Sequence, residues 1–97
     1  MSESIGLLEV NSLLVAVEAI DAMVKSASVM IEGYKMSGDT VLVVISGEYK
    51  NVCASLEIGF RRAQSFQVTA TKHIIALPHA ETKKVLDALI ASNTSLE

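Results

Sequence analysis

The sequence has no tryptophan, one proline, one cysteine, two tyrosines and two phenylalanines among its 97 residues. The single cysteine, Cys53, excludes an internal disulfide and fits a reducing compartment. With so few aromatic residues and a net charge of −3, the chain has neither a basic field nor a stacking surface, which disfavours nucleic-acid binding. No apolar run reaches about 18 residues, and the first four residues lack the basic start of a signal peptide. We therefore predict a cytoplasmic chain that does not contact a membrane.

Apolar residues are abundant instead: 51% of the chain is hydrophobic and only 20% is charged. A chain of this length forms one domain and buries somewhat more than about 60% of its unfolded surface. A domain this small cannot bury so large an apolar fraction completely. We therefore expect that other copies of the chain cover part of its exposed apolar surface. We predict one domain over residues 1–97, with an ordered core over about 5–91 and a flexible tail over 92–97.

The spacing of apolar residues predicts seven elements in the order β-α-β-β-α-β-α. We expect strands over residues 5–10, 29–36, 40–45 and 68–76, and helices over residues 13–27, 48–66 and 80–91. Two βαβ units joined by a hairpin make an α+β fold of the ferredoxin-like, split βαβ kind.

The hairpin over residues 33–47 is the expected centre of this fold. Ser37, Gly38 and Asp39 form a typical turn, because Gly accepts positive φ and the Ser and Asp side chains can bond nearby backbone groups. The segment from Thr40 to Ile45 is almost entirely β-branched or aliphatic, which favours a strand buried on both faces.

The three helices carry apolar residues at helical spacing. Ser12, with Asn11, is the candidate N-cap of the first helix. On that helix the residues sharing one apolar face are Leu13, Val17, Ile20 and Val24. The stripe on the second helix comprises Tyr49, Val52, Cys53, Leu56, Phe60 and Ala63, and the small Gly59 would permit close backbone approach. On the third helix we expect the inward residues to be Val85, Leu86 and Leu89.

Taken together, these segments resemble the bacterial microcompartment shell-protein domain of the small, hexamer-forming kind. The resemblance covers nearly the whole chain and lies in Ile5-Gly6-Leu7-Leu8-Glu9, the segment from Val17 to Ala27, Gly33-Tyr34, Ser46-Gly47-Glu48 and Leu77-Pro78-His79.

The resemblance implies a non-enzymatic, structural role in which six copies form a flat disc and discs tile into a polyhedral shell around metabolic enzymes. The loop between the second and third strands would line a pore on the sixfold axis with Met36, Ser37, Gly38 and Asp39. Contacts between neighbouring hexamers would involve Lys25, Leu77, Pro78 and His79. The implied partners are further copies, other shell proteins and the enclosed enzymes, and no cofactor is implied.

Two features differ from the common pattern of this family. The common pore loop reads Lys-Ile-Gly-Ser-Gly, whereas this chain has Lys35-Met36-Ser37-Gly38-Asp39, with one residue missing just upstream. Six copies of Asp39 would make a ring of carboxylates, which would repel anions or raise some of its own pKa values. The second difference is Leu77, at the place of an arginine that normally crosses the seam between hexamers.

No catalytic or metal-binding constellation is found in the sequence. His73, His79 and Cys53 are not at metal-ligand spacing, and Cys53 lies in an apolar stripe without a basic partner.

Asp39 is equally well explained as a turn residue bonded to its own backbone. An alternative function, from another class, is a small-molecule-binding regulatory module with a ferredoxin-like fold that acts as a dimer or trimer. A small enzyme subunit using His79 or Cys53 is the weakest interpretation.

Overall fold

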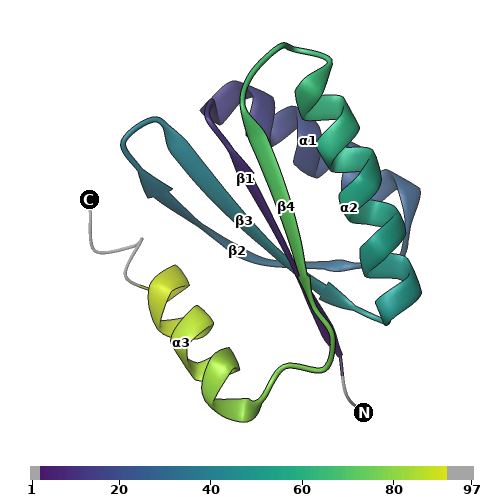
Figure 1. Ribbon diagram of the computed structural model, residues 1–97, viewed down its shortest axis with the longest axis vertical. Helices are drawn as coiled ribbons and strands as arrows, with labels where there is room; N and C mark the ends of the chain where they lie inside the picture. Colours follow the sequence, from purple (N-terminus) through teal and green to yellow (C-terminus); the bar gives the residue numbers. More distant parts are fainter. Residues whose placement is uncertain (1–2, 92–97) are drawn as a thin grey trace.

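A four-stranded antiparallel sheet forms the centre of the computed structural model, which describes residues 3–91 (Figure 1). Its strands are β1 (Ser4–Val10), β2 (Met30–Ser37), β3 (Thr40–Gly47) and β4 (Ala70–Ile75), in the spatial order β2-β3-β1-β4. Strand β3 lies between β1 and β2 of the first βαβ unit, and strand β1 lies between β3 and β4 of the second. Each βαβ unit is therefore split by a strand of the other. The predicted α+β, ferredoxin-like plan is therefore confirmed. The tail predicted over 92–97 lies outside the described residues.

The helices are α1 (Leu13–Ser26), α2 (Tyr49–Gln64) and α3 (Ala80–Ala91). Helices α1 and α2 pack against each other and against one face of the sheet, whereas α3 lies apart from them beside β2 (Figure 1). The core between the sheet and the first two helices includes Val43 and Ile45, whereas Val44 faces a cavity beside α3. Since side chains alternate along a strand, α3 lies against the opposite face of the sheet. None of the helices in the described part of the chain has the length and apolar character needed to cross a bilayer.

Helix α1 begins as predicted but buries a different face. The Val15 N–H donates to Ser12 Oγ at 3.2 Å, which confirms Ser12 as the N-cap. Of the face predicted from the sequence, Ile20 packs against the core, but Leu13, Val17 and Val24 have exposed fractions of 50%, 55% and 45%. The buried face consists of Val15, Ala16, Ala19 and Met23. Small alanines allow the helix axis to come close to its neighbours, so this second apolar stripe takes the inward side.

The close approach predicted at Gly59 of α2 is confirmed, and the approaching segment is α1. A Cβ at Gly59 would lie 2.6 Å from Met23 Cγ, so only glycine fits the present packing. Ser55 Oγ donates to the Met23 carbonyl oxygen at 3.1 Å and joins the two helices at the same level. Along the predicted stripe of α2, Val52, Leu56 and Ala63 are buried, whereas Tyr49 at the start of the helix is exposed.

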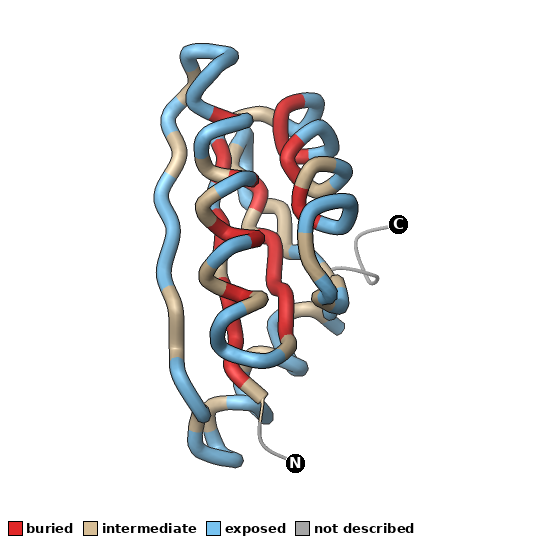
Figure 2. Tube along the Cα trace, turned by 90° about the vertical axis from the view of Figure 1, so that its right-hand side faces the viewer, coloured by how far each residue is buried: buried red, intermediate tan, exposed pale blue. Residues whose placement is uncertain are grey.

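The buried residues concentrate between the sheet and helices α1 and α2 (Figure 2). Strand β3 is buried from Val43 to Ser46, which confirms the prediction of a strand covered on both faces. Helix α3 is different: it buries no residue fully, and the expectation that Val85 and Leu89 point inward is wrong, because they are 60% and 42% exposed. The helix meets the rest of the described chain mainly along β2, so its contact face is narrow.

Candidate functional site

The turn that the resemblance assigns to the pore is a tight two-residue connection between β2 and β3. Ser37 pairs with Thr40, so Gly38 and Asp39 are its two central residues. Gly38 has φ +61°, and a Cβ added there would meet no atom within 4 Å. Positive φ at the first central position alone is typical of a type II′ turn, in which glycine is favoured. The predicted turn is confirmed, and its conformation explains the glycine.

The four residues predicted to line a pore differ in their surroundings. Met36 is partly buried and packs against the core, whereas Ser37, Gly38 and Asp39 are exposed at the tip of the hairpin. No residue from 3 to 91 forms a hydrogen bond or ion pair with the Asp39 carboxylate. The turn therefore does not use this carboxylate to bond its own backbone, and in a single chain the carboxylate faces solvent.

Lys25, predicted to lie at a hexamer edge, is in the last turn of α1. Its Nζ lies 2.9 Å from Asp21 Oδ2 in an i,i+4 ion pair, and both side chains are mostly exposed. The hydrogen bond with Asp21 is the main cause that raises the pKa of Lys25, and the negative charge of the Asp21 carboxylate raises it further. Lys25 therefore stays protonated and is held by its own helix.

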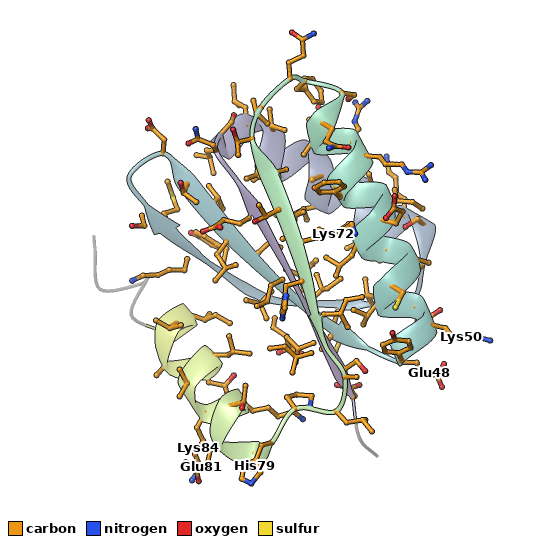
Figure 3. All side chains as sticks on the ribbon, viewed as in Figure 1. Glu48, Lys50, Lys72, His79, Glu81 and Lys84 are labelled. Carbon is orange, nitrogen blue, oxygen red and sulfur yellow. The ribbon has the colours of Figure 1, made fainter. Side chains whose placement is uncertain are left out.

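Leu77, Pro78 and His79 form the corner between β4 and α3. Leu77 has φ +52°, which is unusual for a bulky residue, and its side chain is 63% exposed. The Glu81 N–H donates to His79 Nδ1 at 3.0 Å, and the Lys83 N–H donates to the His79 carbonyl oxygen at 3.2 Å. His79 thus caps the start of α3, where Figure 3 shows it. Within residues 3–91, no hydrogen bond or ion pair joins this corner to Lys25.

The remaining candidate residues, Cys53 and His73, do not come together in one site. Cys53 is half-buried in α2, and the hydrogen bond between Cys53 and Tyr49 raises the pKa of Tyr49. His73 lies exposed on β4. Over residues 3–91, no three His, Cys, Asp or Glu side chains come together in a group that could hold a metal ion.

Sequence reasoning missed a second site, between α3 and the sheet. Ile90 of α3 packs onto Gly33 of β2, where an added Cβ would lie 2.4 Å from Ile90 Cγ2. Nearby, Ser46 Oγ donates to the Glu32 carboxylate across the β2–β3 pair. The glycine inside a predicted strand was the available signal, because such a glycine often marks close approach of another segment.

Comparison with known proteins agrees with this architecture. A family model described as the BMC domain matches residues 4–78. The chain is 38% identical over 85 residues to the bacterial microcompartment shell protein PduA of Citrobacter freundii, covering 87% of this chain and 91% of the relative. It is also 38% identical over 90 residues to the carboxysome shell protein CcmK2 of Synechocystis sp., covering 89% of this chain and 86% of the relative.

A solved microcompartment protein from Desulfitobacterium hafniense has the same fold, with a TM-score of 0.77 and 31% sequence identity. The match covers 91% of this chain but only 48% of the other, so this chain spans about half the length of that protein. The fold is thus a ferredoxin-like, split βαβ domain with an added C-terminal helix. This chain belongs to the BMC-domain family.

Proposed function

We propose that this chain is a structural, non-enzymatic shell protein of a bacterial microcompartment in the cytoplasm, acting over residues 1–97 as one shell domain. The observation that carries the proposal is the match of residues 4–78 to the BMC domain, together with relatives that are named shell proteins. These relatives do not favour the alternative of a regulatory module.

The surface of the single chain supports assembly into larger structures. Twelve large apolar side chains are exposed among the described residues, including Leu14 at 81% and Met30 at 65%. Strands β2 and β4 are the two edge strands of the described sheet, and edge strands offer places for contacts with further chains. Copies of the chain would cover part of this surface in a homohexamer, the unit from which we propose the shell is tiled, alongside other shell proteins and around enclosed enzymes.

Within the hexamer, we propose that six β2–β3 turns surround a central pore, with Ser37, Gly38 and Asp39 at its narrowest part and Met36 behind them. Their exposure at the hairpin tip supports this assignment. Lys25, Leu77, Pro78 and His79 are proposed to face neighbouring hexamers. At these positions the Lys25–Asp21 ion pair and the His79 cap would limit the side-chain freedom lost on contact.

The pore proposal is tested by measuring ion selectivity of the assembled protein in a planar lipid bilayer. Six Asp39 carboxylates would favour cations over anions, and the Asp39→Asn variant should lose most of that preference. Glu48→Gln is the matched control, because Glu48 is exposed, makes no side-chain cap and follows the other end of β3. Equal selectivity in Asp39→Asn and in the unmodified protein would place the pore elsewhere.

A further inference from the structure

A cavity of about 200 Å³ lies between α3 and the face of the sheet that α1 and α2 leave uncovered. Its floor comes from β1 and β3, and its wall comes from α3. The lining residues are Glu3, Ile5, Glu32, Val44, Ser46, Lys83, Leu86, Asp87 and Ile90. Neither the residues of the β2–β3 turn nor Leu77, Pro78 and His79 are among these lining residues.

The residues that form the floor of the cavity are buried. Ile5, Val44 and Ser46 are 5%, 1% and 1% exposed, so two apolar side chains flank one buried hydroxyl. That hydroxyl donates to Glu32 Oε2, so the exposed Glu32 side chain has one carboxylate oxygen directed to the floor. Because no other hydrogen bond to Glu32 occurs over residues 3–91, the carboxylate keeps lone pairs that can accept from a ligand.

The charges around the cavity are unbalanced. Three carboxylates, of Glu3, Glu32 and Asp87, line it together with one ammonium group, of Lys83. Over the described residues none of these four groups forms an ion pair with another charged side chain, although Lys83 and Asp87 are four residues apart on one helix. The described side chains that line the cavity therefore carry a net negative charge above an apolar floor.

These features fit a particular class of ligand. Over residues 3–91 no three acidic side chains are close enough together to hold a metal ion, but a ligand of several atoms can reach separate carboxylates. No aromatic side chain lines the cavity, so a quaternary ammonium ion would find no ring face to bind. A primary ammonium ion has three N–H donors for the carboxylates, and a short alkyl body would contact Val44, Leu86 and Ile90.

We propose that the cavity under α3 is a binding site for a small organic primary ammonium ion, with Glu32 as its main charged partner and Asp87 as a second. Helix α3 forms one wall of the cavity and buries none of its own residues fully. This site is independent of the shell function proposed above.

The test is calorimetric titration of the assembled protein with n-butylammonium chloride, together with methyl NMR spectra. We expect saturable binding and shifts confined to the methyl groups that line the cavity, those of Ile5, Val44, Leu86 and Ile90. Tetramethylammonium chloride, which has the charge but no N–H donor, and sodium butyrate, which has the opposite charge, should bind much more weakly or not at all.

Two variants and one control variant test which carboxylates contribute to n-butylammonium binding. Loss of one charge-assisted hydrogen bond in Glu32→Gln should weaken n-butylammonium binding about tenfold or more. Asp87→Asn, on the surface of α3, should also weaken binding and provides the test if Glu32→Gln does not fold. Glu81→Gln is the matched control on the same helix, because Glu81 projects away from the sheet beside Lys84 (Figure 3). Absence of saturable binding, equal binding of tetramethylammonium, or equal loss in Glu81→Gln would overturn the proposal.

Discussion

Replacing Gly59 by alanine sets two effects of known size against each other. In an exposed helix the change would stabilise, because alanine is favoured over glycine by about 1 kcal/mol in a helix interior. At Gly59 the new Cβ would lie 2.6 Å from Met23 Cγ and 2.7 Å from Met23 Sδ, closer than any ordinary contact. Met23 is completely buried, so its side chain has no open space into which to move.

Overpacking of this kind costs about 1–3 kcal/mol. The hydrogen bond from Ser55 Oγ to the Met23 carbonyl oxygen holds α1 and α2 together at this point, so separating the helices would add to the cost. We therefore expect Gly59→Ala to lower the free energy of unfolding by a net value on the order of 1 kcal/mol. For a domain of this size that corresponds to a fall in Tm of roughly 4–8 °C.

Urea denaturation at one fixed protein concentration measures this effect, because assembly contributes to apparent stability. The control is a double-mutant cycle with Met23→Ala, which removes the side chain that the new methyl group meets. In that background Gly59→Ala should become neutral or stabilising. Stabilisation by Gly59→Ala in the unmodified background would refute the proposed close contact.

Three further predictions follow from the remaining contacts. Ser12→Ala removes the hydrogen bond to the Val15 N–H and should lower stability by about 1 kcal/mol in the same denaturation assay, whereas Ser12→Asp should retain the cap. Hydrogen bonding to Arg61 lowers the pKa of Glu57 below its usual 4.5, so this pair stabilises the fold above that pH and the contribution is lost as the pH falls through the folded-state pKa. Glu57→Gln should therefore flatten the acid side of the stability profile, and an unchanged slope would contradict the ion pair. Lys25→Ala should reduce the size of sheets seen by electron microscopy without changing the native mass, whereas Lys50→Ala should not; smaller sheets in both variants would argue against an edge role.

Much of the fold could be predicted because local signals and long-range packing agree there. The run from Thr40 to Ile45 is almost entirely β-branched or aliphatic, and no residue of β3 is exposed. Ser12 directly before an apolar periodic segment gave the start of α1. Gly59 indicated a place of close approach on α2, although the structure was needed to show that α1 is the segment that approaches.

The inward faces of α1 and α3 could not be read from periodicity. Helix α1 carries two apolar stripes, and the one with the larger side chains, at Leu13, Val17 and Val24, is exposed. Which stripe is buried depends on how near the neighbouring helix comes, and that distance is set by Gly59 of α2. On α3, the position of Ile90 over Gly33 decides the contact face, and this pairing of residues 57 positions apart leaves no local pattern.

In the candidate site, too, local features could be predicted from the sequence and features that depend on long-range packing could not. The turn at Gly38 and Asp39 was predicted from residue type, and its tip position follows from the hairpin. The cap made by His79 and the cavity beside Glu32 were not predicted, because both depend on where α3 returns to the sheet. A corner with Leu77 at positive φ has no recognisable sequence signal, since bulky residues rarely adopt that conformation.

The native mass of the purified chain tests the central claim most directly. Light scattering coupled to size-exclusion chromatography should give six times the chain mass of 10.4 kDa, with the large exposed apolar surface covered between copies. A monomer at micromolar concentration, or a dimer or trimer at every salt concentration tested, would contradict the assignment of this chain to a hexameric shell.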